Sequence, residues 1–483
     1  MPLRARMSTA IVWLRRDLRL ADNPALHAAL AAHARVLPVY IHAPEEEAPW
    51  QPGAASRWWL HHSLSALDES LRACGARLHI VRGPSLQTLQ RLIESCGAAA
   101  VYWNRLYEPA ALARDRDIKQ SLRARGITAH SCNAALLFEP WQLATGEGSP
   151  YRVFTPFWRS ALTSMDAVAC TPAAQRIDMP PMPTCTPLAA LDLLPRLRWD
   201  RGLAAHWQPG ESGAQALLHA FIEQAVHGYK AQRDYPAVTG TSRLSAHLHF
   251  GEIGPRQILA ALREHAGNDR VGAASSIAPY VRELGWREFS HHLLYHFPHT
   301  PTRNFNPRFD VFAWADDGVH AEALARWQQG RSGIPIVDAG MRELWHTGWM
   351  HNRVRMIVAS LLTKNLRLHW LHGARWFWDT LVDADLANNT QGWQWSAGTG
   401  ADAAPYFRIF SPVAQSAKFD AAGDYIRRWL PELAAVPAPL LFQPWRDAAL
   451  LQRTGYPPPL LDLAASRAQA LAAYQQLRAQ AAR

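Results

Sequence analysis

The chain has 483 residues, too many for one ordinary hydrophobic core, so at least two domains are expected. Hydrophobic residues make up 48% and charged residues 19%, which is typical of a globular protein and excludes a disordered or fibrous chain. The net charge of +10, from 50 Lys and Arg against 40 Asp and Glu, suits a polyanionic partner but is equally compatible with a solubilising surface.

The cysteines and the first residues of the chain indicate the cellular compartment of the protein and whether it contains a structural metal site. Five cysteines, an odd number without a CxxC pair, indicate a reduced intracellular protein with no structural zinc, and we expect no metal site. Residues 1–7 contain Arg4 and Arg6 but no long apolar stretch follows, and no run approaches the ~18 residues of a membrane span. The sequence therefore predicts a cytoplasmic protein inside a bacterial cell, without a membrane partner.

Residues 1–135 alternate short β-rich runs with helical patterns. Residues 11–14, 36–41, 77–81 and 100–104 are expected to be buried strands, and residues 23–33 and 56–74 helices. This alternation predicts an α/β domain with a doubly wound, Rossmann-like parallel sheet. After the first strand, Leu14, Arg15, Arg16 and Asp17 stand where a dinucleotide-binding loop would have glycines, which argues against a nicotinamide dehydrogenase.

Residues 136–210 are interrupted by prolines and are expected to connect the two domains. Residues 211–483 follow helical periodicity, first at Ala214, Leu217, Leu218, Phe221 and Ile222, and no convincing strand is present. The sequence thus predicts an all-α C-terminal domain that ends in an alanine-rich helix.

Four segments of the helical domain contain residues suited to chemistry. In the first, Tyr229 and Arg233 precede Thr241, Ser242 and Arg243, which offer donors for a phosphate, although a Thr-Ser pair is more often a helix cap. In the second, Glu283, Trp286 and Arg287 lie within about one helical turn, a pattern that an ordinary amphipathic helix also shows.

The third segment, residues 348–356, is basic and contains Asn352 and Met356 on one helix face. A basic helix with Trp and Met suits a nucleic-acid groove with an apolar floor. The fourth contains Asp383 and Asp385, which can accept hydrogen bonds from a cofactor; a metal loop would be richer in acids.

Tryptophan is unusually frequent, and ten of the 21 fall between Trp286 and Trp395. Most buried tryptophans only pack. A cluster this dense nevertheless supports a hypothesis of stacking on a planar ligand, or of electron transfer between rings. Trp393 and Trp395 are two residues apart, so one can face the interior and the other an open cavity.

These four segments, in this order and spacing, resemble the photolyase/cryptochrome family, and most of all its class I cyclobutane pyrimidine dimer photolyases. The resemblance runs from residues 12–19 to residues 429–433. It implies a light-driven DNA repair lyase that holds FAD, active in its reduced form, inside the helical domain and binds UV-damaged DNA at a basic surface. It also implies a monomer that needs no protein partner.

The resemblance assigns the flavin site residue by residue. It implies that Asp383 pairs with Arg355, that Asp385 bonds the flavin ring edge or ribityl chain, and that Asn389 faces flavin N5, where plant cryptochromes have Asp and insect ones Cys. The full set of implied FAD contacts is Tyr229, Thr241, Ser242, Arg243, Leu244, Ser245, Tyr280, Arg355, Asp383, Ala384, Asp385 and Asn389.

The resemblance likewise implies a cavity for a flipped-out pyrimidine dimer, because a buried flavin cannot reach a dimer inside a duplex. Its implied lining is Glu283, Trp286, Asn352, Met356 and Trp395, with Arg233, Arg287, Arg353 and Gln415 on the rim or on the flanking DNA backbone. Glu283 would bond the pyrimidine edge, and Trp286 and Trp395 would sandwich the dimer. Trp393, Trp370 and Trp314 match the family's electron-transfer chain, although residues 316–320 look like an insertion next to Trp314.

A second, light-harvesting chromophore is possible. Folate-binding members carry polar or acidic side chains after the Tyr-Glu pair that matches Tyr107 and Glu108, whereas Pro109, Ala110 and Ala111 follow here, which argues against a folate. A deazaflavin, another flavin or no second chromophore stay open. Two other functions stay open. A (6-4) photolyase would have a second His in place of Asn352, and a cryptochrome photoreceptor shares the fold but need not keep Trp286 and Trp395.

Overall fold

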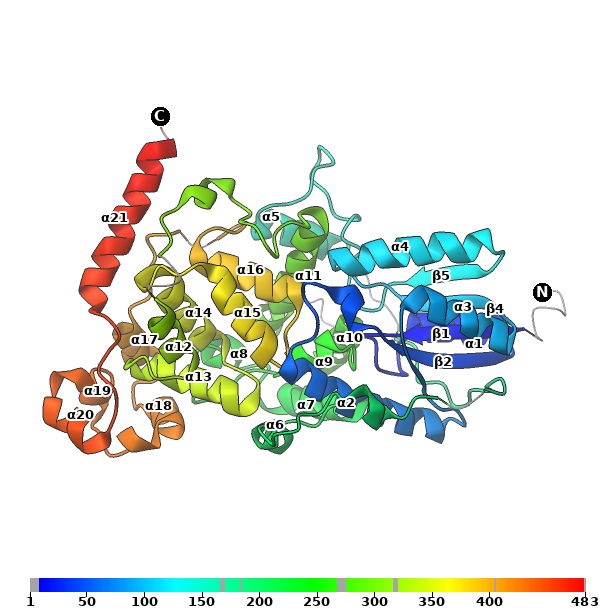
Figure 1. The fold of residues 1–483 in the computed structure, drawn as a ribbon, viewed down its shortest axis with the longest axis horizontal. Coiled ribbons are helices and arrows are strands. Elements are labelled where there is room, and N and C mark those ends of the chain that lie inside the picture. The colour runs from blue at the N-terminus through cyan, green and yellow to red at the C-terminus, as the bar shows by residue number, and fades with distance from the viewer. Residues whose placement is uncertain are drawn as a thin grey trace.

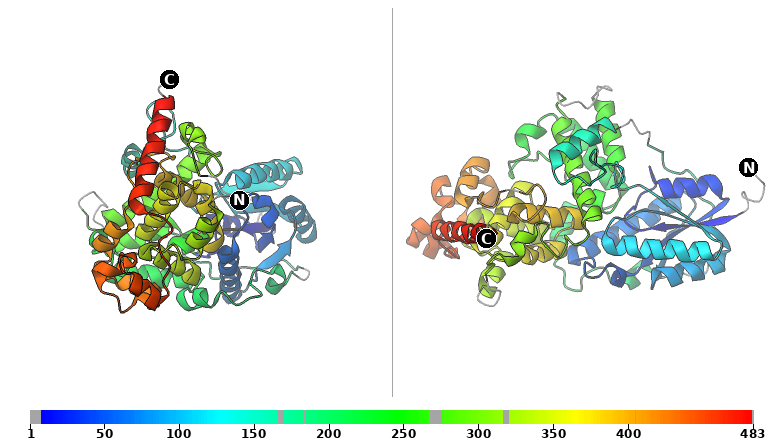
Figure 2. Two further views of the ribbon diagram at one scale, coloured as in Figure 1. Left: turned by 60° about the vertical axis from the view of Figure 1, so that its left-hand side comes forward. Right: turned by 90° about the horizontal axis from the view of Figure 1, so that it is seen from above.

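The computed structural model describes residues 8–165, 170–182, 185–266, 275–315, 320–403 and 405–481. The start of the chain, residues 1–7, and most of the suspected insertion, residues 316–319, lie outside the described residues. A sheet-bearing part and a helical part lie next to each other along the long axis of the molecule (Figures 1 and 2). No helix in the described ranges is long and apolar enough to cross a membrane.

Five parallel strands form the sheet, in the order β3-β2-β1-β4-β5. Their bounds are Thr9–Leu14 for β1, Arg35–His42 for β2, His79–Arg82 for β3, Ala98–Asn104 for β4 and Thr128–Cys132 for β5. In the central register, Ile11 lies between Leu37 and Val101. The prediction of a doubly wound parallel sheet is confirmed. The fifth strand was not predicted.

Helices cover both faces of the sheet, which explains why β1 is buried along its whole length. Val12, Val36 and Tyr102 belong to the core shared with α1 and α2, whereas Ile11, Leu37 and Val101 face α3 and α4. The helices are α1 Pro24–Ala32, α2 Ala54–Ala73, α3 Ser85–Cys96 and α4 Pro109–Ala124.

The segment after β5 is more structured than a connecting segment was expected to be. Helix α5 (Phe154–Thr163) lies within it and packs Phe154, Phe157 and Trp158 into the core of the helical part. Helix α6 (Arg201–His206) follows. The many prolines hid α5 from the sequence analysis, although its aromatic residues recur at a helical spacing.

In the described residues after β5, every regular element is a helix. The longest are α7 Glu211–Gln224, α11 Ala278–His296, α13 Pro335–Thr347, α16 Leu386–Ala397 and α21 Leu463–Ala481. The others are α8 Tyr229–Gln232, α9 Ser245–His249, α10 Pro255–His265, α12 Ala321–Gln328, α14 Asn352–Ser360, α15 Trp370–Thr380, α17 Pro412–Phe419, α18 Asp424–Trp429, α19 Ala438–Leu441 and α20 Ala448–Thr454. The all-α prediction for this part of the chain is confirmed, and the core lies around α13, α14, α15 and α16.

Buried polar contacts join the two parts. The Arg19 side chain, only 1% exposed, donates hydrogen bonds to the carbonyl oxygens of Asp22, Ala134 and Gly251 at 2.7, 3.2 and 2.8 Å. Gly251 belongs to the helical part, so one guanidinium connects both. The indole of Trp59 on α2 adds a 3.0 Å bond to the Glu252 carboxylate. Buried donors with full sets of acceptors hold such a junction in one geometry.

Candidate functional site

The loop between α8 and α9 is joined to α11 by two tyrosines. The Tyr280 hydroxyl donates to Ser242 Oγ at 2.9 Å, and the Tyr229 and Tyr280 rings meet edge to face at 5.3 Å. Burial raises the pKa of Tyr280 to about 12, so it remains a hydrogen-bond donor at neutral pH. Thr241 is partly exposed, Leu244 is buried and Ser245 is exposed. The structure therefore brings the predicted residues of the first segment together with Tyr280.

Arg243 in this loop has the features of an anion-binding residue. Its backbone has a left-handed φ of 54°, and its guanidinium lies over two indoles, 4.5 Å from the Trp349 ring and 5.1 Å from the Trp207 ring. Its Nε is buried and has no hydrogen-bond partner among the described residues. A buried donor of this kind fits a cofactor phosphate, which accepts hydrogen bonds and carries negative charge.

The predicted pairing of Arg355 with Asp383 is present. Arg355 Nη2 lies 2.8 Å and 3.1 Å from the two carboxylate oxygens, and Arg355 Nε donates to the Met350 carbonyl at 2.7 Å. The pair joins α14 to the segment before α16. Each charge is compensated, so the pair can lie beside a cofactor without an isolated buried ion.

Asp385 caps the helix that carries Asn389. Its Oδ1 accepts from the backbone N and the side-chain Nδ2 of Asn388 at 2.8 and 2.7 Å. Asn389 follows in the first turn of α16, and its amide donates to the Ala374 carbonyl at 3.0 Å. The neighbouring Ala384 is buried and lines a cavity at the junction of the two parts.

Two histidines that the sequence analysis missed face Asp385. His291 Nε2 lies 3.4 Å and His249 Nδ1 3.7 Å from its Oδ2. Burial raises the pKa of the Asp385 carboxyl, but His291 and His249 outweigh burial and hold that pKa well below its usual range. Both histidines lie on helices remote in sequence from Asp385, so no local motif could have indicated them.

The second segment lies on α11 as predicted, with its residues in defined contacts. Glu283 forms a salt bridge with Arg233, the residue that follows α8. The indole of Trp286 stacks on Phe154 of α5, with centroids 3.6 Å apart and planes 8° from parallel. Trp286 is only partly buried, which suits stacking of a planar ligand.

Arg287, predicted at the cavity rim or on the flanking DNA backbone, contacts the segment after β5. Its Nη1 donates to the Ala135 carbonyl at 2.7 Å and lies 3.5 Å from Glu288, and the side chain is 12% exposed. These contacts join Arg287 to the junction between the two parts. Next to it, burial raises the pKa of Glu288 to about 7.

The third segment borders a polar cavity of about 480 Å³ near the molecular surface. Arg353, Arg408, Gln415 and Lys418 line it together with the aromatic residues Tyr235, Phe410 and Phe419. Arg353 pairs with Asp234 at 2.9 Å and lies 4.3 Å from the Phe419 ring. Cations interleaved with aromatic rings are typical of single-stranded nucleic-acid surfaces.

The amphipathic helix of this segment is also as predicted. Val354, Ile357 and Val358 of α14 are fully buried, whereas Asn352 is exposed and Met356 is partly buried. The Asn352 amide lies 4.0 Å from the Met356 sulfur, so the two share one face.

The predicted tryptophans Trp393 and Trp395 lie on α16, Trp370 begins α15, and Trp314 precedes α12. Trp393 is 2% exposed while Trp395 is partly exposed, as the two-residue spacing predicted. Gly373 lies against the Trp393 ring, where a Cβ would clash. Trp370 and Trp314 are joined through His369, whose ring lies 5.4 Å from the first and 5.1 Å from the second.

Trp327 was not predicted; its ring packs against Trp393 at 6.2 Å. In the described part of the chain, no group of three or more metal-ligating side chains gathers.

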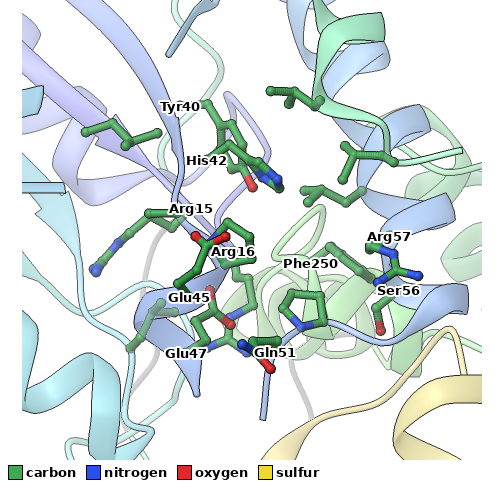
Figure 3. A pocket seen from close by; sticks show the side chains of 18 of the residues that line it. Arg15, Arg16, Tyr40, His42, Glu45, Glu47, Gln51, Ser56, Arg57 and Phe250 are labelled. Carbon is green, nitrogen blue, oxygen red and sulfur yellow. The ribbon is translucent and has the colours of Figure 1, made fainter. Parts of the chain in front are cut away.

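Two further cavities lie at the junction of the two parts. The first, of about 300 Å³, is bordered by the carboxyl ends of β1 and β2, with Arg15, Arg16, His42, Arg57 and Phe250 around it (Figure 3). The second, of about 340 Å³, includes Glu108, Pro109, Ala110 and Ala111 in its wall. Arg16 borders both, and its guanidinium pairs with Glu108 at 2.6 Å.

Comparison with known proteins decides the family. Residues 10–180 match the model of the DNA photolyase domain, and residues 280–476 match the FAD-binding domain of DNA photolyase. The deoxyribodipyrimidine photo-lyase of Agrobacterium fabrum is 45% identical over 97% of this chain and 98% of its own length. The chain belongs to the photolyase and cryptochrome family.

Both branches of the photolyase and cryptochrome family are represented among its relatives. Cryptochrome-1 of Arabidopsis thaliana is 38% identical over 97% of this chain and 70% of its own length. A bacterial class III photolyase from Agrobacterium tumefaciens superposes with a TM-score of 0.92 at 44% identity, covering 98% of both chains. An archaeal photolyase from Sulfolobus tokodaii with two FAD molecules gives 0.82 at 29% identity, over 97% of this chain and 100% of its own. The photolyase prediction is confirmed at the level of the family; class I is not, since the Agrobacterium structure is of class III.

The FAD-binding match covers Tyr280, Arg355, Asp383, Asp385 and Asn389. The residues present fit the cofactor of this domain. Arg243 offers an unpaired buried donor for a phosphate, and the Arg355–Asp383 pair is already compensated.

Proposed function

We propose that this photolyase-family protein is a deoxyribodipyrimidine photo-lyase that binds UV-damaged DNA and splits cyclobutane pyrimidine dimers under blue light. The observation that carries this proposal is the combination of a partly exposed indole, Trp286, supported from below by Phe154, with a cavity lined by cations and aromatic rings. A photoreceptor that does not bind DNA needs neither feature.

DNA recognition divides into two kinds of contact. Arg353, Arg408 and Lys418 provide positive charge for phosphates, which fixes the position on the duplex without reading sequence. Trp286 and Trp395 take the flipped dimer between them, and a damaged step is easier to unstack than an intact one. Arg233 holds Glu283 through their salt bridge, so the carboxylate is oriented toward the pyrimidine edge.

The residues around Asp383 to Asn389 position the cofactor. FAD supplies the light-driven one-electron chemistry when it is bound, and no general acid or base of the chain is required. Tyr229, Thr241, Ser242, Arg243, Leu244, Ser245 and Tyr280 hold one side of it, and Arg355, Asp383, Ala384, Asp385 and Asn389 hold the other. Trp393, Trp370 and Trp314 connect this region to the surface, so they can conduct an electron inward.

We further propose that residues 1–135 bind a second, light-harvesting chromophore in the cavity beside Arg57. Ligands of open α/β sheets bind at the carboxyl ends of the strands, and this cavity lies at the ends of β1 and β2. The archaeal relative with two FAD molecules supports a flavin there. The other junction cavity has apolar Pro109, Ala110 and Ala111 in its wall, so a folate is not favoured in it. Residues 136–210 connect the two parts, and residues 211–483 hold FAD and DNA.

A repair assay tests the main proposal. Purified protein with reduced FAD is illuminated with blue light in the presence of an oligonucleotide that contains one thymine dimer, and restored thymines are counted against a dark control. We expect light-dependent restoration by a monomeric protein from the cell interior. Flavin-loaded protein that restores nothing would instead favour a cryptochrome, to which the 38% identity with the Arabidopsis protein points. A matched oligonucleotide with one (6-4) lesion is tested in parallel, and restoration of that lesion alone would favour a (6-4) photolyase, which Asn352 argues against.

A further inference from the structure

Two adjacent histidines on α11, both buried, have different surroundings. His292 is 1% exposed, and its Nδ1 lies 3.0 Å from the Pro140 carbonyl. Its Nε2 has no hydrogen-bond partner among the described residues. Burial, reinforced by nearby His296, lowers the pKa of His292 to about 4, so this ring is neutral at neutral pH.

His291, 5% exposed, faces a hydrogen-bond acceptor at each ring nitrogen. Its Nδ1 lies 3.0 Å from the Arg287 carbonyl, which only accepts, so Nδ1 carries a hydrogen. Its Nε2 lies 3.4 Å from Asp385 Oδ2, and an ionised carboxylate also only accepts. A hydrogen on each nitrogen would make the ring an imidazolium.

Asp385 is ionised in this arrangement. Its other oxygen accepts the backbone N–H of Asn388 as the N-cap of α16, and a helix N-terminus favours negative charge. Ionisation of a carboxyl that is 8% exposed requires a compensating cation. The described side chains that lie nearest to Oδ2 and can carry a positive charge there are His291 and His249.

His249 also faces Asp385 Oδ2, at 3.7 Å, whereas the two arginines near the pair have other partners. Arg287 on the same helix is engaged with Ala135, and Arg16 from the sheet-bearing part is paired with Glu108. The groups that face the pair are Arg287 and Glu288 of α11, His249 of α9, Tyr107 after β4, and Arg16 after β1.

We propose that His291 carries a positive charge in the folded protein and is a positioning residue of the flavin site. It holds Asp385 in place as the cap of α16, and thereby fixes Asn389 in the first turn of that helix. The Asn389 backbone N–H also bonds to the Asp385 carbonyl at 2.8 Å, so displacement of Asp385 moves Asn389 directly. The effect on flavin binding rests on the proposed place of FAD beside Asp385, whereas the charge of His291 does not.

The charge is tested by nitrogen NMR on histidine-labelled holoprotein. The ring signals of His291 and His292 are assigned by their loss in His291→Gln and His292→Gln. At neutral pH, both nitrogens of His291 should have imidazolium shifts, whereas His292 should give the two distinct shifts of a neutral ring. A neutral His291 would overturn the proposal. If His291→Gln does not fold, His291→Lys and the shift of the His291 signals in Asp385→Asn provide the assignment.

The positioning role is tested by the rate at which FAD leaves the diluted holoprotein, followed by the fluorescence of free flavin. His291→Gln should release FAD about tenfold faster or more, because the ion-pair contact with Asp385 is lost. His292→Gln, the matched control on the same helix, should release it as slowly as the wild type. In the Asp385→Asn background, His291→Gln should add little.

These outcomes separate the two proposals. An equal effect of His291→Gln with and without Asp385→Asn would show that His291 does not act through Asp385. The same would follow if His291→Gln and His292→Gln released FAD equally fast. A wild-type protein that never retains FAD would refute the flavin site, and the ring-nitrogen spectrum of that protein would still determine whether His291 is charged.

Discussion

Replacing Trp286 with alanine tests lesion recognition directly. The indole lies parallel to the Phe154 ring on one side, with the centroids 3.6 Å apart, and Phe289 meets it edge-on at 6.0 Å. Among the described rings, Phe154 is thus the one stacked face to face on Trp286. Its partial exposure leaves indole surface for a base of the dimer.

The expected loss follows from one stacking contact. Stacking of a base on an aromatic side chain contributes about 1–3 kcal/mol, which corresponds to roughly 5- to 150-fold in affinity for dimer-containing DNA. We propose that affinity for undamaged DNA depends on phosphate contacts from Arg353 and Lys418, so it should change little. Loss of the stack on Phe154 also lowers the free energy of unfolding, by about 0.5–1.5 kcal/mol. Trp286→Phe should retain most of the discrimination.

Binding is measured with matched oligonucleotides, with and without one thymine dimer, at one fixed salt concentration. Trp345→Ala is the matched control, because Trp345 also stacks on another ring, Trp376 at 6.1 Å, and is 58% exposed, yet it lies on α13 and has no proposed role in DNA binding. An equal loss on both oligonucleotides would show that Trp286 acts through folding or non-specific binding. An unchanged affinity on both would remove Trp286 from the cavity.

Two further predictions concern the electron path and pH. Trp393→Phe should abolish light-driven reduction of oxidised flavin while chemically reduced enzyme still repairs; photoreduction at the wild-type rate would refute the proposed path. Glu288, whose pKa burial raises to about 7, binds its proton more tightly in the folded state, so it favours folding at low pH and this stabilisation is lost as pH rises toward 7. The free energy of unfolding is measured with urea at several pH values up to 7, and Glu288→Gln should lose this pH dependence. An unchanged pH dependence would assign the effect to another group.

Patterns with a short period in the sequence predicted the fold well. The buried face of α14 and the opposite environments of Trp393 and Trp395 follow from helical geometry alone. The strand β5 was missed because its residues, from Thr128 to Cys132, are mostly polar and the strand lies at the sheet edge, with alternate side chains exposed. An edge strand of this kind has little hydrophobic signal.

Contacts between remote segments were the least predictable part of the site. The resemblance assigned Arg355 and Asp383 to one site, and the structure pairs them. It assigned Arg287 to the cavity rim or the flanking DNA backbone, and no local pattern indicated that the guanidinium bonds to Ala135, which is 152 residues away. His249 and His291 have no local motif, since their partner Asp385 lies on another helix.

The buried junction around Arg19 has a consequence for light harvesting. Excitation energy passes between two chromophores without contact, at a rate that falls steeply with their separation and depends on the angle between their transition dipoles. The bonds from Arg19 to Asp22, Ala134 and Gly251 hold the sheet-bearing part at one orientation to the helical part. A chromophore in the cavity beside Arg57 would therefore keep a constant distance and angle to the flavin. The efficiency of energy transfer to the flavin would then be the same in every molecule.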